Sequence, residues 1–592
     1  MASNADIANA FEEMAALLEI TGGSGFRVNA YRRAARTCAD APDDLCVVAT
    51  RVPKQLEAMD GIGAGLAARI IEFASTGTMA DLVELRASVP PGLPELLELQ
   101  GVGPKTVRTL WTDGGIESVA ALKAAIESGA LAGLPRIGTP KSIANLREAV
   151  EHHLAAAGAP KRFRIGQALP VGEAVAARLR AVAGVSRVEI AGSARRGRET
   201  VGDLDVLVGI ADDAAAERVS ASAVSMDGVA KVLARGPTKV SLRLAHGLQV
   251  DVRMVGADAF GAALLYFTGS KEHNVQLRER AIARGMHLNE YGLFPDDGSP
   301  APQERGIAPV AAADEASIYA ALGMPLIPPE CREAHGELGW TEAPRLVEVG
   351  DIQCELHAHT TESDGQLSIA ALAELAKSRG FHTIAVTDHS RASAQANGLS
   401  VERLLRHIDA VRAAEAAVGG IRILAGSEVD ILADGHLDYD DETLAKLDIV
   451  VASPHTALRQ DPVTATERLL AAIRNPFVHI IGHPTGRIIL GRDGLSPDIR
   501  AVAAAAAEHG VALEINAHWM RLDLRDSHAR AAMEAGAMIA INCDIHAAED
   551  ADNLRYGVLT ARRAGVTPDR CVNCLDRTGL DRWLRRRRGG RH

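Results

Sequence analysis

The hydrophobic and polar positions of the chain follow different patterns in different stretches. Residues 1–150 carry apolar side chains at helical spacing between short glycine turns, which predicts a helical region. Residues 161–258 change to short β-rich runs interleaved with a helix at 171–183, and residues 261–322 mix helical and strand pieces. Residues 324–350 are proline-rich with little periodicity, which is typical of a linker.

After residue 350, apolar strand-like runs alternate with segments of helical length. This alternation predicts parallel β-α units that close into a barrel. The chain as a whole is therefore expected to be multidomain, with α+β parts followed by an α/β barrel. The seven runs are ELHAHT, TIAVTDHS, RILAGSEV, IVVASPHT, HIIGHPT, VALEINAH and IAINCDIH.

The composition limits the class of protein. A length of 592 residues indicates about four domains, and 47% hydrophobic with 24% charged residues is typical of a soluble chain. No apolar run reaches the roughly 18 residues needed to span a bilayer, and the first residues lack a signal-peptide pattern. The 7 scattered cysteines indicate no disulfide framework. We therefore expect no membrane segment and a cytoplasmic location.

The net charge of −12 excludes a globally basic nucleic-acid binder, so contacts with phosphate must come from local patches and backbone amides. Glycine hairpins in the helical region offer such amides, because each precedes a helix. We predict that they bind the DNA backbone; the alternative is that the glycines only connect helices. The hairpins contain Gly61 and Gly63, then Gly101 and Gly103 followed by Lys105, and finally residues 137–141.

Two carboxylates two positions apart indicate a metal site. Asp203 and Asp205 lie on a predicted strand, so both side chains project from one face. Asp251 lies on a later strand. If the two strands are neighbours, the three carboxylates converge and can hold two divalent ions, Mg²⁺ or Mn²⁺, about 3.5–4 Å apart. Such a site activates a 3′-hydroxyl and stabilises leaving pyrophosphate.

The segment before these carboxylates offers groups that bind phosphate. Gly192 and Ser193 open a turn whose amide and hydroxyl can hold phosphate, and Arg196 can neutralise a triphosphate. The pattern predicts nucleotidyl transfer. It also suits other nucleotidyltransferases, such as tailing or tRNA-end-adding enzymes, and the alternative without chemistry is a solvated edge strand.

This constellation resembles the palm of the family X DNA polymerases. The glycine hairpins and residues 28–32 resemble the helix-hairpin-helix elements of that family, and residues 266–291 resemble its thumb. The resemblance covers residues 1 to about 335. It implies that Tyr266 and Phe267 line the sugar pocket and disfavour a 2′-hydroxyl. It further implies nucleotide contacts for Gly202, Gly269 and Asn274, the last at the minor-groove edge of the incoming base, and a template-strand contact for Arg278.

One activity of some family members is not expected. Where they carry a lysine that forms a Schiff base and removes 5′-deoxyribose phosphate, this chain has Arg69, and an earlier position has Gly65. A guanidinium stays protonated and cannot form an imine. We predict no efficient lyase activity, which a borohydride-trapped adduct with an abasic 5′ end would contradict.

Most of the chain's 20 histidines lie after residue 350, many at the predicted carboxyl ends of strands, where barrel enzymes place their sites. Imidazole and carboxylate without thiolate suit zinc, manganese or iron. Nine such residues are too many for one ion, so we predict two or three metals that orient a phosphoester and generate hydroxide. The nine are His357, His359, Asp364, His389, Glu428, His455, His483, Asp544 and His546.

These positions resemble the metal ligands of the polymerase-and-histidinol-phosphatase (PHP) domain, over residues 350–575. Two interpretations are open for Asp388 and residues 514–516: they support the ligands, or they only make hydrogen bonds at a helix start or strand end. The resemblance implies one metal on His357, His359, Glu428 and Asp544, a second bridged by Glu428 and held by His455 and His483, and a third on Asp364, His389 and His546.

Together, the resemblances imply a bacterial-type family X DNA polymerase with a C-terminal (β/α)7 PHP barrel. We predict template-directed filling of short gaps, with metal-dependent 3′-5′ exonuclease or other 3′-end processing by the PHP part, as suits base excision repair. The expected partners are gapped or primer–template DNA and deoxynucleoside triphosphates, and the chain is expected to be a monomer. Two alternatives are open: the PHP part is a small-molecule phosphoesterase like histidinol phosphatase, or the chain is a DNA-end-binding scaffold with an inactive palm.

The patterns also set domain boundaries. The last segment carries Arg585 to Arg588, and we expect this basic tail to be disordered, with contacts to DNA as an alternative role. The predicted parts are a helix-hairpin-helix domain at 1–85, a fingers-like helical domain at 86–160, the palm at 161–260, the thumb at 261–325, a linker at 326–350, the PHP domain at 351–575 and the tail at 576–592.

Overall fold

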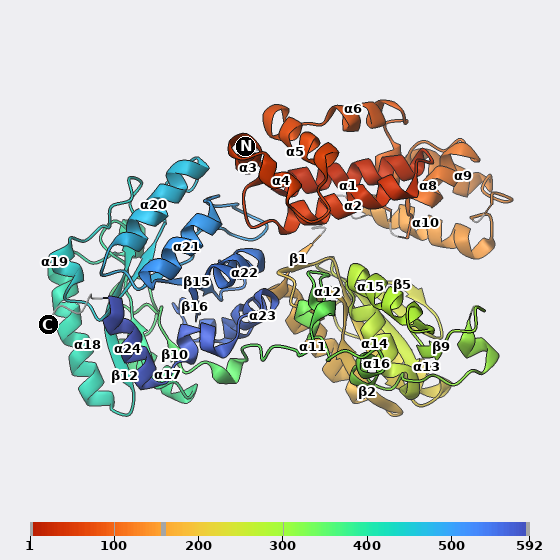
Figure 1. Cartoon of the computed structure of the whole chain (residues 1–592). Helices are drawn as coiled ribbons and strands as arrows, with labels where there is room; N and C mark the ends of the chain where they lie inside the picture. Colours follow the sequence, from red (N-terminus) through yellow and green to blue (C-terminus); the bar gives the residue numbers. More distant parts are fainter. Residues whose placement is uncertain (1–3, 100, 136, 156–161, 300, 588–592) are drawn as a thin grey trace. The chain divides into compact units, whose positions relative to one another are not determined.

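The chain folds into two compact units, Met1–Ala159 and Pro160–His592, in a computed structural model (Figure 1). The structure describes residues 4–99, 101–135, 137–155, 162–299 and 301–587. The predicted boundary between residues 160 and 161 and the end of the basic tail, with Arg588, lie outside the described residues.

The first unit is helical throughout its described residues, as predicted. Its core buries Phe11, Ile70, Leu110 and Leu122 completely, and each such side chain contributes about 1.5–3 kcal/mol. Polar caps fix the helix starts, as where Ser118 accepts a hydrogen bond from the first turn of its helix. The helices are α1 (Asn4–Ile20), α2 (Gly25–Asp40), α3 (Leu45–Arg51), α4 (Lys54–Glu57), α5 (Ala64–Thr76), α6 (Ala80–Ala87), α7 (Leu93–Leu97), α8 (Pro104–Thr112), α9 (Val119–Ser128) and α10 (Pro140–Ala155).

The second unit begins with a five-stranded sheet in the order β2-β4-β7-β6-β5, the palm of the sequence analysis. Strands β4 and β7 are parallel neighbours, and the other pairs are antiparallel. A separate two-stranded sheet joins β1 to β3. The elements are β1 (Phe163–Arg164), α11 (Ile165–Arg180), β2 (Val185–Ile190), α12 (Gly192–Arg195), β3 (Thr200–Val201), β4 (Asp203–Ile210), α13 (Asp213–Val224), β5 (Val229–Arg235), β6 (Lys239–Leu244) and β7 (Gln249–Gly256).

A smaller helical part with one antiparallel hairpin follows. The proline-rich segment after it was expected to be a plain linker, yet it is packed: Arg332 is fully buried, and Glu330 and Glu337 are also buried. Its lack of periodicity reflects ion pairs and short turns instead of mobility. The elements of the smaller part are α14 (Phe260–Thr268), α15 (Lys271–Ile282), β8 (Met286–Asn289), β9 (Gly292–Pro295) and α16 (Glu315–Ala321).

The last part is a parallel seven-stranded sheet in sequential order, with helices around it, as predicted (Figure 1). A parallel bridge between Ala358 and Ile545 joins the segments that follow the first and last strands, so the sheet nearly closes into a barrel. Its strands are β10 (Cys354–Glu355), β11 (Thr383–Val386), β12 (Arg422–Asp430), β13 (Ile449–Ser453), β14 (Ile480–Ile481), β15 (Ala512–Asn516) and β16 (Met538–Asn542). Its helices are α17 (Ile369–Ser378), α18 (Val401–Val418), α19 (Asp441–Leu444), α20 (Pro462–Arg474), α21 (Ile499–His509), α22 (Asp526–Ala535), α23 (Leu554–Ala564) and α24 (Arg577–Arg587).

Helix α24 corrects one prediction. The basic tail was expected to be disordered, but Arg577–Arg587 is helical. Leu580, Trp583 and Leu584 recur at helical spacing and are buried in the same core as strand residues of the barrel. The run of arginines hid this apolar stripe from the charge-based interpretation.

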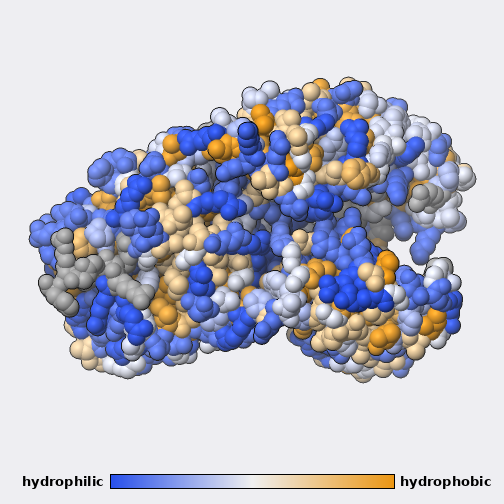
Figure 2. Space-filling model, in the orientation of Figure 1, coloured by the Kyte–Doolittle hydropathy of each residue, from blue (hydrophilic) through white to orange (hydrophobic). Residues whose placement is uncertain are grey.

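The outer surface is mixed in character. On the face drawn in Figure 2, hydrophilic residues alternate with scattered apolar ones. None of the helices in the part of the chain that the structure describes combines the length and the apolar character that a membrane-spanning helix needs.

Candidate functional site

The three palm carboxylates lie together at the start of two adjacent strands. Asp205 of β4 is directly opposite Asp251 of β7, so the expectation that the two strands are neighbours is confirmed. Basic side chains balance them: Lys239 Nζ lies 2.7 Å from Asp251 Oδ2, and Arg253 Nε lies 3.4 Å from Asp205 Oδ1. Asp203 is exposed, whereas Asp251 is buried.

Desolvation and neighbouring negative charge make two of the palm carboxylates, Asp203 and Asp205, harder to ionise. Burial, reinforced by the charge of Asp203, raises the pKa of Asp205 to about 6. Asp203 is exposed, but the protein atoms around its carboxylate partly desolvate it, and this desolvation together with the charge of Asp251 raises its pKa. A pair of divalent cations would relieve this repulsion, and oxygen ligands of this kind suit Mg²⁺ or Mn²⁺. The residues therefore fit the two ions expected from the sequence.

The turn before β4 is shaped around Asp205. Gly192 has φ +64°, and a Cβ there would lie 2.7 Å from Asp205 Oδ2, so only glycine leaves room for the carboxylate. Ser193 follows in the short helix α12. The Arg196 guanidinium donates from one Nη to the Thr268 carbonyl at 2.6 Å. Gly202, which immediately precedes Asp203, is partly exposed.

Some of the predicted DNA- and nucleotide-contacting residues of the thumb line one small pocket, but Phe267 and Gly269 do not. Tyr266, Asn274 and Arg278 line it together, and the Asn274 amide donates to the Tyr266 carbonyl at 2.8 Å. Tyr266 is 40% exposed, so the aromatic pair does not belong entirely to the core. The Phe267 ring lies 4.2 Å from the guanidinium carbon of Arg253, which connects the thumb to the palm carboxylates.

Gly269 also has a structural reason to be glycine. It has φ +72°, and a Cβ there would lie 3.0 Å from an Nη atom of Arg196. The thumb backbone therefore lies close to Arg196, the residue that is predicted to bind the triphosphate.

Two of the predicted glycine hairpins leave their helix starts open, whereas the one at residues 137–141 is crowded, because a Cβ on Gly138 would lie 2.7 Å from the Gly133 amide nitrogen. Gly61 and Gly101 have φ +76° and +74°, and a Cβ on Gly63 or Gly103 would meet no atom within 4 Å. Lys105 is exposed beside the second hairpin. This space allows a phosphate to approach the backbone closely.

The arginine that replaces the lyase lysine is engaged in contacts. Arg69 Nε donates to Asp81 at 2.9 Å, and one of its Nη atoms donates to the Gly65 carbonyl at 2.6 Å. Its guanidinium is thus held by partners from two segments.

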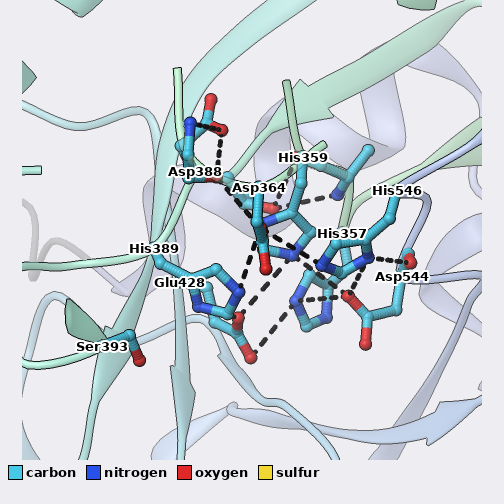
Figure 3. A network of polar contacts seen from close by, with 12 residues as sticks. His357, His359, Asp364, Asp388, His389, Ser393, Glu428, Asp544 and His546 are labelled. Carbon is cyan, nitrogen blue, oxygen red and sulfur yellow. Dashed lines mark hydrogen bonds and ion pairs between the residues drawn. The ribbon is translucent and has the colours of Figure 1, made fainter. Parts of the chain in front are cut away.

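The barrel brings the nine predicted ligands to the carboxyl ends of its strands. Figure 3 labels His357, His359, Asp364, His389, Glu428, Asp544 and His546 among them. Glu428 is central: its Oε1 lies 2.8 Å from His483 Nε2, 3.2 Å from His455 Nε2 and 3.3 Å from His357 Nε2. His359 Nε2 lies 3.0 Å from Asp544 Oδ1. In the described residues, the groups with ligand atoms within 4.8 Å of one another are His359 with Asp364, His389 and His546; His357 with His359 and Asp544; and His389 with Glu428 and His455.

The ligand atoms face one another without forming hydrogen bonds. Both carboxylate oxygens of Glu428, both ring nitrogens of His359 and Oδ1 of Asp544 are buried and have no hydrogen-bond partner. Buried polar atoms are otherwise almost always paired, so these lone pairs point at common centres, as metal ligands do. Burial alone would raise the pKa of Glu428, but the neighbouring histidines hold it well below its ordinary value, so the carboxylate is ionised.

A second layer of buried polar groups orients the ligands, as expected for residues 514–516, whereas Asp388 accepts hydrogen bonds from the Thr360 amide and hydroxyl at 2.9 and 2.8 Å. Glu514 Oε1 lies 2.8 Å from His357 Nδ1, and its Oε2 accepts from the His483 backbone amide at 2.7 Å. Asn516 donates to Asp544 Oδ2 at 2.9 Å. These contacts fix ring orientation and leave the outer imidazole nitrogens for metal.

Two residues of this layer were missed. Asp430 Oδ1 lies 3.0 Å from His455 Nδ1, and His407 Nε2 lies 2.8 Å from Asp388 Oδ2. The spacing of Glu428 and Asp430, two apart on one strand, was a usable signal. His407 gave none, because it occupies a core position of α18 where its spacing is that of an apolar residue.

The backbone is distorted at two ligands. His483 has φ +22° and Asp544 has φ +55°, values that residues other than glycine rarely adopt. Such conformations cost about 1–3 kcal/mol each and concentrate at functional sites.

Comparison with protein families divides the chain in the same order as the geometry. Four family models match: a helix-hairpin-helix domain at residues 2–79, a SAM-like helix-hairpin-helix tandem at 93–155, a DNA polymerase beta thumb at 263–333 and a PHP domain at 355–518.

One similar protein matches the whole chain. The chain is 36% identical over 588 residues to the DNA polymerase/3'-5' exonuclease PolX of Bacillus subtilis (strain 168), covering 98% of this chain and 99% of that protein. Shorter proteins match part of the chain. A probable phosphatase of Shewanella sp. (strain MR-4) is 36% identical over 204 residues, 33% of this chain and 76% of its own length. One of Thermoanaerobacter sp. (strain X514) is 31% identical over 230 residues, 37% of this chain and 89% of its own length.

Proposed function

The chain belongs to the family X DNA polymerases that carry a C-terminal PHP domain, and from this we propose that it fills short DNA gaps and processes 3′ ends. The observation that carries the proposal is the presence of two separate ligand sets in one chain. Three carboxylates lie on adjacent strands of the palm, and nine imidazole and carboxylate groups lie at the mouth of the barrel. No residue belongs to both sets.

In the palm, Asp203, Asp205 and Asp251 would hold two Mg²⁺ or Mn²⁺ ions. When bound, these ions activate the primer 3′-hydroxyl and stabilise the leaving pyrophosphate. The chain's own residues bind and orient the deoxynucleoside triphosphate. The turn at Gly192 and Ser193 takes phosphate oxygens, with Arg196, Gly202 and Gly269 close by. Tyr266 and Phe267 face the sugar, Asn274 the base edge and Arg278 the template strand.

In the barrel, the nine ligands would hold two or three ions of manganese, zinc or iron, which supply hydroxide and orient a phosphodiester. Glu514 keeps the Nδ1 proton of His357 engaged, so that Nε2 can bind metal. Asp364 and His546 are the most exposed ligands, with side chains 36% and 32% exposed. The DNA 3′ end therefore approaches from their side of the cluster.

We further propose that the hairpins at Gly61, Gly63, Gly101, Gly103 and Lys105 hold the DNA backbone without reading its sequence. We propose the domain boundaries expected from the sequence, except that helix α24 belongs to the PHP part. In the same proposal the protein is a cytoplasmic monomer of base excision repair, in which the PHP site cleans a 3′ terminus and the palm extends it. Arg69 leaves it without efficient lyase activity.

The proposal is tested with a 5′-labelled primer on a gapped template in Mn²⁺, with and without deoxynucleotides. Lengthening reports synthesis, and shortening reports exonuclease. Asp203→Ala with Asp205→Ala should abolish lengthening and leave shortening, and His357→Ala with His359→Ala should do the reverse. Loss of both activities in either double variant would contradict two independent sites.

A second candidate function concerns the barrel alone. Its shorter relatives are named probable phosphatases, which favours hydrolysis of a small phosphomonoester. Histidinol phosphate and a single-stranded oligonucleotide, each offered with Mn²⁺, distinguish the two. An inactive DNA-end scaffold is disfavoured because all three palm carboxylates are in place, and primer extension on a gapped duplex decides it.

A further inference from the structure

The palm turn that precedes the catalytic carboxylates packs against a helix of the PHP part. The turn and the helix belong to the same compact unit. Gly197 lies in this turn with φ +66°. A Cβ there would lie 3.2 Å from Leu559 Cβ and 3.6 Å from Arg563 Cδ, both on α23. Contact this close leaves the turn little freedom to move away from the helix.

Arg563 reaches from α23 into the turn. One of its Nη atoms donates to the Arg196 carbonyl at 2.8 Å and to Glu333 Oε1 at 2.9 Å. Its Nε donates to Asp526 Oδ2 at 2.8 Å. The side chain is only 4% exposed, so these contacts form away from water, where charge-assisted hydrogen bonds are strong.

Glu333 extends the contact to the side chain of Arg196. Arg196 Nε donates to Glu333 Oε1 at 3.1 Å, and Arg198 lies 3.8 Å from the same oxygen. Burial would raise the pKa of Glu333, but Arg563 and Arg196 lower it to about 2, so it stays ionised between them. The backbone and the guanidinium of Arg196 are thus both tied to one PHP arginine.

A second contact holds the far end of the turn. Arg487 donates to Glu199 Oε2 at 2.6 Å, and it lies four positions after the ligand His483. Glu199 is between Arg196 and the catalytic Asp203. The turn is therefore anchored to the PHP part at both ends.

We propose that Arg563, although it belongs to the PHP part, is a positioning residue for nucleotide addition in the palm. It fixes Arg196 through the Arg196 carbonyl and through Glu333, so that the guanidinium meets the triphosphate in one geometry. This inference rests on the proposed polymerase function. It assigns the PHP part a role in synthesis that is independent of its metals.

The test is steady-state filling of a one-nucleotide gap by the full chain. Arg563→Ala should raise the KM for the deoxynucleoside triphosphate about tenfold, while the KM for DNA and the exonuclease rate stay within about twofold. Glu333→Gln, which keeps the side-chain shape, should raise the same KM, and the double variant should show less than the product of the two effects. Arg563→Lys keeps the positive charge beside Asp526 but lacks the planar set of guanidinium donors. The KM of this variant for the triphosphate should therefore lie between those of the wild type and Arg563→Ala.

Arg555→Ala is the matched control. Arg555 lies on the same helix and also pairs with a palm residue, Glu173, at 3.0 Å, but it does not touch the turn. Its KM for the triphosphate should equal that of the wild type. A wild-type KM in both Arg563→Lys and Glu333→Gln, or an equal rise in Arg555→Ala, would overturn the inference. Failure of the wild-type chain to extend any primer would instead refute the proposed function.

Discussion

The palm and PHP centres of this chain hold charged groups in opposite ways. In the palm, three carboxylates on two strands are balanced by the partly exposed side chains of Lys239 and Arg253. In the barrel, Glu428 and His359 are fully buried, and a carboxylate and an amide of a second layer hold the neighbouring residues His357 and Asp544.

The difference indicates two modes of metal use. A site with few protein ligands and an open side is completed by ligands from its substrate, as when triphosphate oxygens coordinate Mg²⁺. A site whose buried lone pairs have no hydrogen-bond partner needs its ions to be stable at all, because unpaired buried polar atoms are costly. The PHP metals should therefore be resident, and the palm metals should arrive with the nucleotide.

Metal removal should give the largest effect, and it should distinguish the two modes of metal use. Chelation should lower the exonuclease rate more than about 100-fold. It should also lower the unfolding temperature of the chain by several degrees, because an ion whose free concentration is about 100 times its Kd stabilises the folded state by about 2.7 kcal/mol. Added Mn²⁺ should restore both. The measurements are oligonucleotide shortening and thermal unfolding.

Double variants in each of the two ligand sets are the controls for metal removal. Asp203→Ala with Asp205→Ala should lose as much thermal stability on chelation as the wild type, and His357→Ala with His359→Ala should lose much less. An equal response of the wild type and the histidine variant would mean that the PHP metals are not resident.

Glu514→Gln should give the next largest effect. The amide can still contact His357, but it cannot hold the Nδ1 proton as a charged acceptor, and it weakens the contact with the His483 amide. We expect a 10–100-fold loss of exonuclease activity or metal affinity, as is usual for such supporting groups, with synthesis unchanged. Glu508→Gln, an exposed position in the same part, is the control. Equal losses of synthesis and exonuclease would place the effect on folding instead.

A smaller effect, confined to the palm, is expected from the raised pKa of Asp205. Because the pKa of Asp205 is raised to about 6, the carboxyl is protonated below that pH, and a proton competes with a cation. Mn²⁺ affinity without nucleotide should be constant above about pH 6 and fall about tenfold per pH unit below it. The measurement is Mn²⁺ titration of the full chain, with the Asp203→Ala/Asp205→Ala variant as the background that reports binding by the PHP part. Asp205→Asn should abolish the dependence, and a flat wild-type profile down to pH 5 would contradict it.

The sequence was most informative where chemistry follows strand ends. The clustering of the nine barrel residues and of the three palm carboxylates was predictable because a parallel strand brings its last residues to one edge, and alternate residues share one face. Contacts between distant segments were not predictable. Arg563 is one of several arginines in its helix, and only the fold brings it to Arg196. Helix α24 was mistaken for a disordered tail because its charge outweighs Leu580, Trp583 and Leu584 in composition.

The smallest expected effect concerns the side-chain cation that lies beside Asp251 before metal ions bind in the palm. Lys239 Nζ lies 2.7 Å from Asp251 Oδ2, where it neutralises a carboxylate that must later bind a cation. The ammonium therefore competes with metal, and Lys239→Met should lower the Mg²⁺ concentration for half-maximal synthesis about threefold, a modest change because the side chain is partly exposed. Lys231→Met, at an exposed position of the neighbouring strand β5, should leave it unchanged. A higher Mg²⁺ requirement in Lys239→Met would show that the lysine orients Asp251 for the metal, and the palm would then share with the barrel a supporting layer of its own.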